Sequence, residues 1–180
     1  MKTGTEHMPK MPKPNRCIEI LRENGCSNAV IKHCIAVRDL AVKIAEKTNA
    51  NKQIVEAGAL LHDLGRSKTH GIKHGIEGGE IARKIGLPEP LIFIIERHIG
   101  AGIPKKEAAK LGLPDKDYLP ITLEEKIVSH ADSLIQRGKK QKIEKEVEKA
   151  MKKGQKEHSQ RLLKLHRELS NLCGMDLNEI

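Results

Sequence analysis

The sequence predicts an all-α protein built around one core. Segments with apolar residues at helical spacing follow one another along the chain, separated by short stretches that contain Gly, Asn or Pro. No segment combines alternating apolar and polar residues with a hairpin turn, which is the pattern of a half-buried strand. The length of 180 residues is within the usual range of a single domain. We therefore expect one helical domain.

The expected helices begin after a short N-terminal arm. Prolines within residues 1–15 predict that this arm is flexible. A short helix then ends at Gly25, and Ser27 or Asn28 caps a long amphipathic helix. Further helices are expected at about residues 53–63, 75–85, 88–98, 105–111 and 122–136.

The last part of the chain is rich in Lys and Glu. Gly154 divides it into two expected helices, and apolar residues recur at helical spacing in both. We expect residues 139–180 to form a helical extension that packs on a core formed by residues 16–138. The leucines of the final helix favour a homodimer.

The net charge of +9 lies mostly in the N-terminal arm and in the Lys-rich stretch at 139–156. Glutamates are interleaved with those lysines, which is typical of a solvated helix face. Phe93 and Tyr118 are the only aromatic residues, so stacking platforms for nucleic-acid bases are not expected. We therefore do not expect nucleic-acid binding, and binding through the Lys-rich helix stays an alternative.

The sequence also bears on the compartment. The chain has no run of the roughly 18 to 20 apolar residues that span a bilayer, and its first residues lack the apolar region of a secretory signal. Its four cysteines have no C-x-x-C spacing. We expect a cytoplasmic protein with reduced thiols and no membrane partner.

Histidines and aspartates carry the chemical signal. Six of the nine histidines fall between His33 and His130, and His33 and His62 lie on apolar helix faces. A buried imidazole needs a polar partner. For one histidine a hydrogen-bonded core position is the simpler explanation, but several histidines beside Asp63 and Asp132 favour a metal ion.

This set has a recognisable order. His33, then His62-Asp63, then Asp132, on successive helices, resembles the H…HD…D pattern of the HD-domain metal-dependent phosphohydrolase superfamily. The stretch His62-Asp63-Leu64-Gly65-Arg66 is similar to its HDIG variant, with Leu in place of Ile. The resemblance covers about residues 29–137 and implies an HD-domain helical bundle. The whole chain resembles an archaeal HDIG branch of this superfamily.

The resemblance implies a ligand set. His33, His62, Asp63 and Asp132 would hold one ion, and His74 and His98 with bridging Asp63 would hold a second, as in family members with two metals. A single ion is the alternative. Mixed His and carboxylate ligands suit divalent Fe, Mn, Co, Ni or Zn.

The implied reaction is hydrolysis at phosphorus. A metal-activated hydroxide would cleave a phosphomonoester, phosphodiester or phosphoanhydride of a small nucleotide-like substrate. Asp63 and Arg66 are the predicted catalytic residues. Cations in the loops after the ligands would bind the substrate phosphate, and these are Arg66, Lys68, Lys105 and Lys106.

Other possibilities stay open. A non-catalytic HD module that binds a nucleotide or metal and regulates a partner would have the same ligands. His70 is a support for a ligand, a proton donor or a solvated loop residue, and His130 is expected to serve packing. Three carboxylates, Glu77, Glu80 and Glu96, could orient ligand imidazoles. Arg97 and the loop at 100–104 depart from the cyclic-di-nucleotide branch of the superfamily, so that substrate is not expected.

Overall fold

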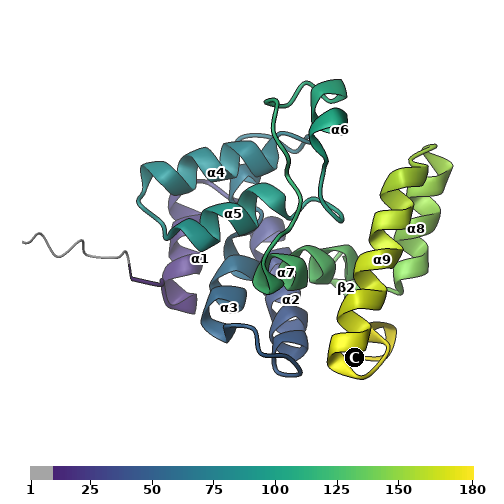
Figure 1. The fold of residues 1–180 in the computed structure, drawn as a ribbon. Coiled ribbons are helices and arrows are strands. Elements are labelled where there is room, and N and C mark those ends of the chain that lie inside the picture. Colours follow the sequence, from purple (N-terminus) through teal and green to yellow (C-terminus); the bar gives the residue numbers. More distant parts are fainter. Residues whose placement is uncertain (1–9) are drawn as a thin grey trace, which may run out of the picture.

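The protein is helical, which confirms the predicted fold class (Figure 1). The computed structural model describes residues 10–180, so most of the predicted N-terminal arm, residues 1–9, lies outside the described residues. The elements are α1 (Pro14–Glu23), α2 (Asn28–Ala45), α3 (Lys52–Leu61), η1 (Leu64–Ser67), α4 (His74–Lys84), α5 (Glu89–Arg97), α6 (Lys105–Lys110), α7 (Leu123–Leu134), β1 (Ile135–Gln136), β2 (Lys139–Lys140), α8 (Ile143–Lys152), α9 (Lys156–Cys173) and η2 (Leu177–Glu179).

Helix starts follow from short polar side chains and proline. The Ser27 hydroxyl accepts a hydrogen bond from the Val30 amide and caps α2. The side chains of Asn51 and Thr122 cap α3 and α7 in the same way, and Pro14 occupies the first turn of α1. A helix leaves the amide groups of its first turn unpaired. The side chains of Ser27, Asn51 and Thr122 accept hydrogen bonds from such amides, and Pro14 has no N–H group that needs a partner.

The core is continuous from α1 to the C-terminal helices. Helix α7 packs against α2, α3 and α5, and it also contacts α8 and α9. Ile127 of α7, Ile143 of α8 and Leu162 of α9 are all fully buried members of one apolar cluster. Figure 1 shows α8 and α9 side by side at one end of the molecule and α4 and α5 at the other.

One element was not expected. Residues 135–140 form a two-stranded antiparallel hairpin, so the helix expected at about residues 122–136 ends two residues earlier, at Leu134. Its two turn residues, Arg137 and Gly138, both have positive φ, at 52° and 74°. A turn of this kind matches the twist of paired strands, but an Arg-Gly pair is a weak signal for it. The strands are too short to show alternation.

The sequence analysis also led to expectations about membrane-spanning segments and about the cysteines. Within residues 10–180, no helix is long and apolar enough to cross a membrane. The four cysteines, Cys17, Cys26, Cys34 and Cys173, are all free thiols, and burial raises the pKa of Cys17 to about 12 and that of Cys26 to about 11.

Candidate metal centre

The fold brings six predicted ligands together although they come from five helices. His33 lies on α2, His62 and Asp63 follow α3, His74 begins α4, His98 follows α5, and Asp132 lies near the end of α7. Two groups of these side chains place their ligand atoms within 4.8 Å of one another: His33 with His62 and Asp132, and His62 with Asp63 and His98.

The end of α3 explains how two adjacent residues can both face the centre. Helix α3 was expected to continue to Asp63, but it ends at Leu61, and Asp63 has φ −96° and ψ 18°, outside the helical region. A short 3-10 turn, η1, then begins with the Arg66 amide donating to the Asp63 carbonyl at 2.9 Å. The break in the helix removes the 100° separation between successive side chains.

Gly65 in this turn allows α4 to come close. A Cβ atom at Gly65 would overlap the carbonyl oxygen of His74 and the amide nitrogen of Gly78. The absence of a side chain therefore lets the start of α4 lie directly against η1, which places His74 beside Asp63.

Asp63 divides the centre into two halves. Its Oδ2 atom lies 3.7 Å from Nε2 of His33 and 3.7 Å from Nε2 of His62. Its Oδ1 atom lies 3.3 Å from Nε2 of His74 and 3.4 Å from Nε2 of His98. The two oxygens of one carboxylate thus face two different pairs of imidazoles, as expected of a bridging ligand.

Asp132 completes the first half. Its Oδ1 atom lies 2.9 Å from Nε2 of His33 and 3.5 Å from Nε2 of His62. The first half therefore contains two imidazoles and two carboxylates, and the second contains two imidazoles and the shared Asp63.

Backbone carbonyls set the tautomer of three of the imidazoles. Nδ1 of His62 lies 2.7 Å from the Ala59 carbonyl, and Nδ1 of His98 lies 2.7 Å from the Ile95 carbonyl. Nδ1 of His74 lies 2.8 Å from the carbonyl of Gly71. A carbonyl only accepts, so each Nδ1 donates, and each neutral ring keeps a lone pair on Nε2. The carboxylates considered for this role do not supply it. Glu96, for example, pairs with Arg83 and Lys116.

The remaining polar atoms of the centre fit divalent cations. His62 Nε2 and Asp63 Oδ1 are buried, and neither has a hydrogen-bond partner within residues 10–180. Burying such atoms without partners is costly. Imidazole nitrogens with free lone pairs and two carboxylates form a donor set suited to first-row transition metals.

The electrostatics point the same way. Burial disfavours charge here, yet the Asp63 carboxylate raises the pKa of His62 well above its usual value. Burial also opposes ionisation of Asp63 and Asp132, but neighbouring imidazoles hold the pKa of each carboxyl well below its usual range. Burial lowers the pKa of His98. The carboxylates thus create a field that favours positive charge at this point.

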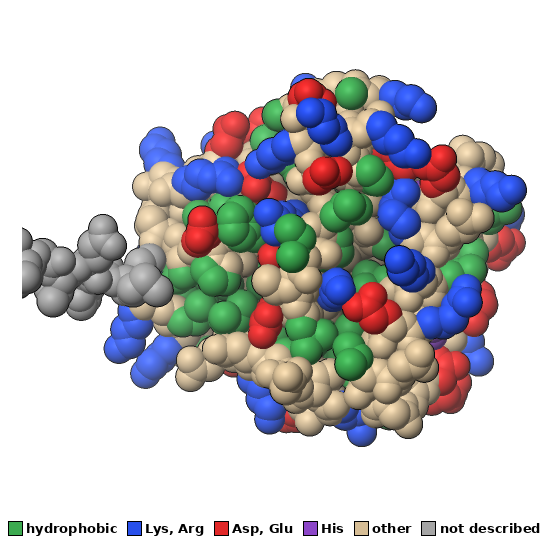
Figure 2. Space-filling view, in the orientation of Figure 1, with side chains coloured by type: hydrophobic (Ala, Val, Ile, Leu, Met, Phe, Trp, Pro, Cys, Tyr) green, Lys and Arg blue, Asp and Glu red, His purple; other side chains and the backbone are tan. Residues whose placement is uncertain are grey.

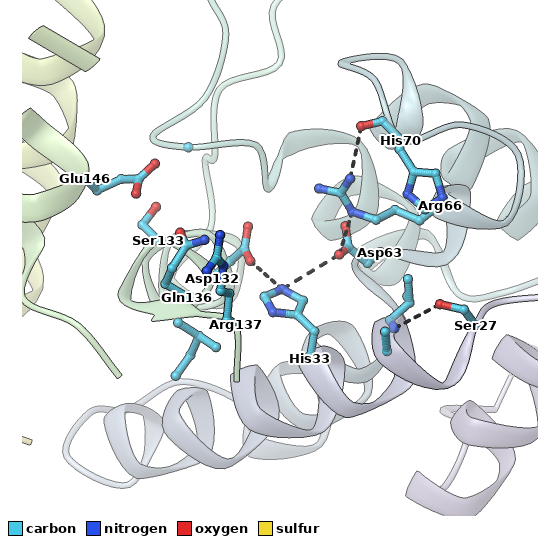
Figure 3. A pocket seen from close by; sticks show the side chains of 14 residues that line it. Ser27, His33, Asp63, Arg66, His70, Asp132, Ser133, Gln136, Arg137 and Glu146 are labelled. Carbon is cyan, nitrogen blue, oxygen red and sulfur yellow. Dashed lines mark hydrogen bonds and ion pairs between the residues drawn. The ribbon is translucent and has the colours of Figure 1, made fainter. Parts of the chain in front are cut away.

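A cavity of about 500 Å³ opens onto the first half of the centre. His33, Asp63 and Asp132 line it, and Figure 3 shows Arg66 and His70 on one side of them and Gln136 and Glu146, with Arg137, on the other. This volume is within the usual range for pockets that bind small molecules.

Arg66 is fixed beside the centre. Its Nε atom donates to Asp63 Oδ2 at 2.9 Å, and its Nη1 atom donates to the His70 carbonyl at 3.1 Å. The residue therefore holds Asp63 in place while its side chain lines the cavity. His70 contributes its backbone to this contact and also lines the cavity.

The other predicted cations are elsewhere. Lys68 is exposed and does not line the cavity. Lys105 and Lys106 lie on α6, where they pair with Asp115 at 3.1 Å and with Glu157 at 2.9 Å. These lysines were expected at the cavity because they follow His98 in the sequence. The loop after His98 instead leads away from the cavity and forms α6.

Several cavity residues were missed from the sequence. Gln136 and Arg137 lie in the hairpin, at the end of the expected core, and Glu146 lies on α8, within the expected C-terminal extension. None of the three was expected to reach the site. The positive φ of Arg137 was the local signal, but it is visible only in the structure. His166, given no role, is buried and bonded to His130 at 3.0 Å, so His130 has a specific partner besides its packing role.

Fold and site together define a helical protein with a buried His and Asp centre suited to divalent cations. The chain belongs to the HD domain family, whose model matches residues 30–136.

The chain is also similar to individual proteins in sequence and in fold. The chain is 48% identical over 164 residues to the uncharacterized protein MJ0778 of Methanocaldococcus jannaschii, covering 87% of this chain and 96% of that protein. It is 45% identical over 170 residues to a tRNA (cytidine(56)-2'-O)-methyltransferase of Thermoplasma volcanium, covering 94% of this chain but only 50% of that protein. A phosphodiesterase PgpH HD domain of L. monocytogenes, solved in complex with cyclic-di-AMP, has the same fold, with a TM-score of 0.55 and 19% identity over 88% of this chain and 96% of that chain.

Proposed function

We propose that this HD-domain protein is a metal-dependent phosphohydrolase that acts on a nucleotide-like substrate. The observation that carries the proposal is the position of Asp63, whose two oxygens face two separate pairs of imidazoles. A cavity suited to a small molecule lies directly against this centre. HD membership and the phosphodiesterase fold likeness support the same class of reaction.

The residues divide into two tasks. His33, His62, Asp63 and Asp132 would hold one divalent ion, and His74, His98 and Asp63 would hold a second. When bound, such ions lower the pKa of a coordinated water and offset the charge of a phosphate. Arg66 positions Asp63 and presents its guanidinium to the cavity, where it would stabilise negative charge that develops on a phosphate.

The substrate class rests on several supports. A phosphate ester fits a cavity that contains a cation site and arginines. The structural neighbour was solved with a cyclic dinucleotide, and one relative is named for action on tRNA. Because the chain spans half of that relative, methyl transfer is not carried over, and RNA enters only as one phosphodiester to be tested.

The Lys-rich helix does not favour the nucleic-acid alternative. Lys149 pairs with Glu146 and Lys152 pairs with Glu148 along α8. Pairs of this kind are typical of a solvated helix face. Figure 2 shows Lys and Arg side chains interspersed with Asp and Glu side chains across the visible face.

The test is a hydrolysis screen of the purified protein. Nucleoside monophosphates, dinucleoside polyphosphates, cyclic dinucleotides and short RNA are incubated with Mn, Fe, Co, Ni or Zn, and released phosphate or product is measured. We expect activity that falls at least about 100-fold in Asp63→Asn, because the shared ligand is lost. Asp115→Asn, a change of the same kind on an exposed loop, is the matched control.

The outcomes separate the alternatives. Hydrolysis that is equal in wild type and Asp63→Asn would contradict the proposal. Tight nucleotide binding without turnover under any metal would support the regulatory module instead.

A further inference from the structure

A second arginine faces the cavity from the side opposite Arg66. Arg137 lies in the turn between β1 and β2, five residues after Asp132, and its side chain lines the cavity (Figure 3). Arg66 uses part of its guanidinium on Asp63 and His70. Arg137 is exposed, and within residues 10–180 its guanidinium has no hydrogen bond or ion pair. Its donors are therefore available to a ligand.

The backbone at Arg137 is unusual. Its φ is 52°, and within the described part of the chain it is the one residue other than glycine with a positive φ. Turns of this type favour Asn-Gly, because a Cβ atom crowds the following carbonyl oxygen at positive φ and the short polar side chain of Asn offsets part of that cost. The chain nevertheless has Arg-Gly here. Backbone strain of this kind is typical of residues at functional sites. The presence of Arg at this position therefore favours a function for its side chain in the cavity.

The turn is held in place by its neighbours. The Gln141 amide donates to the Leu134 carbonyl at 2.8 Å, and Lys149 donates to the side-chain oxygen of Gln136 at 2.6 Å. These contacts connect the hairpin to α7 and α8. Arg137 therefore extends from a fixed support, which favours specific binding over a loose surface charge.

We propose that Arg137 binds a second phosphate of the substrate, next to the phosphate that is cleaved. This inference rests on the proposed function and narrows its substrate class. The metal ligands and Arg66 face the first phosphate, and the planar guanidinium of Arg137 fits a second one through two parallel N–H bonds. The site then selects phosphoanhydrides and dinucleotides over simple monoesters.

The test is calorimetric binding of two probes that resist hydrolysis. Protein loaded with Mn and freed of excess metal is titrated with methylenediphosphonate, which has two phosphonates, and with methylphosphonate, which has one. Elemental analysis before and after titration shows that the protein keeps its metal.

The informative variant is Arg137→Asn. It creates the Asn-Gly pair that this turn favours, so the melting temperature should stay equal or rise. We expect its affinity for methylenediphosphonate to fall at least tenfold, while that for methylphosphonate changes less than twofold. Arg137→Lys should lie between, because it keeps the charge and loses the fork. Lys139→Gln removes a neighbouring charge that does not line the cavity, and should bind both probes as wild type does.

The results distinguish this inference from the proposed function. Unchanged diphosphonate binding in Arg137→Asn, an equal loss of both probes, or no binding by wild type overturns the role of Arg137, even if wild type hydrolyses phosphate esters. A second outcome is that Arg137→Asn selectively loses affinity for methylenediphosphonate although the wild-type protein hydrolyses no phosphate ester in the screen. That result supports the anion site at Arg137 and contradicts the proposed phosphohydrolase activity.

Discussion

The Nε2 atoms of His74 and His98 lie 3.0 Å apart. Each ring donates its Nδ1 proton to a backbone carbonyl, so in the neutral rings both Nε2 atoms carry lone pairs directed at each other. Oδ1 of Asp63 lies 3.3 and 3.4 Å from the same two atoms. Three acceptors this close repel one another unless a cation lies between them. The arrangement therefore supports the proposal of a second ion, beside the one that His33, His62, Asp63 and Asp132 would hold.

His98→Gln should reduce the bound metal from two ions to one. The change removes an Nε2 ligand from the second half and leaves His33, His62 and Asp132 in place. The measurement is metal per protein by elemental analysis after loading with Mn. His158→Gln, a histidine on α9 outside both ligand groups, is the control. Two ions retained in His98→Gln would contradict the binuclear arrangement.

Removal of metal should destabilise the fold. The buried acceptors of the centre lose their partner when the cation leaves, and binding to the folded state alone adds about 2.7 kcal/mol at a metal concentration 100 times the Kd. We expect chelation to lower the melting temperature of wild type measured by circular dichroism. In Asp63→Asn, which lacks the shared ligand, chelation should have little effect. An equal drop in both proteins would show that the chelator acts elsewhere.

The sequence was sufficient to predict the helices and to single out six side chains that the fold brings together. Apolar spacing and capping residues such as Ser27 are local signals, and α2 begins where they predict. Four of these side chains could be singled out because His33, His62-Asp63 and Asp132 have a family order. The roles of the cations could not be found, because whether Lys105 reaches the site depends on the path of the loop after His98.

Arg137 shows the other limit of the sequence. The proposed role of Arg137 in phosphate binding depends on the positive φ of its turn. It also depends on the hairpin lying across the cavity from Arg66, and neither feature can be read from the sequence. Residues of the Lys-rich segment also look like solvent-exposed surface when their charge alone is considered. Glu146 lies at the cavity because α8 packs back toward α7, a contact between elements that helical periodicity does not encode.

Gly65→Ala should damage both stability and metal binding. The added Cβ would overlap backbone atoms of His74 and Gly78, which cannot move without shifting α4. Overpacking of this kind costs typically about 1–3 kcal/mol or more, and a shift of α4 also moves a ligand. Urea unfolding and metal content measure the two effects. Gly71→Ala is the matched control, because its Cβ would meet only the Thr69 hydroxyl, at 3.6 Å. Equal behaviour of the two variants would contradict this account of the close approach.

A chain of hydrogen bonds, buried at His130 and His166 and exposed at Asp176, connects α7 to the segment after α9. Asp176 accepts from Nε2 of His166 at 2.9 Å, so Nδ1 of His166 accepts from Nε2 of His130 at 3.0 Å. Burial lowers the pKa of His130 to about 3, which keeps that ring neutral. The hydrogen bond from the Asn178 amide and the contact with His166 lower the pKa of the Asp176 carboxyl.

Asp176→Asn should therefore reduce stability in a way that depends on pH. Because the folded pKa of Asp176 is lowered, its contribution is fully present above the unfolded value of about 3.9 and is lost as the pH falls through the folded value. The side chain is exposed and screened, so we expect a loss of up to about 1 kcal/mol at pH 7. Urea unfolding followed by circular dichroism at pH 7, 5 and 3 measures it, and the difference from wild type should shrink only at the lowest pH. A difference that is the same at all three values would mean that the charge of Asp176 does not contribute.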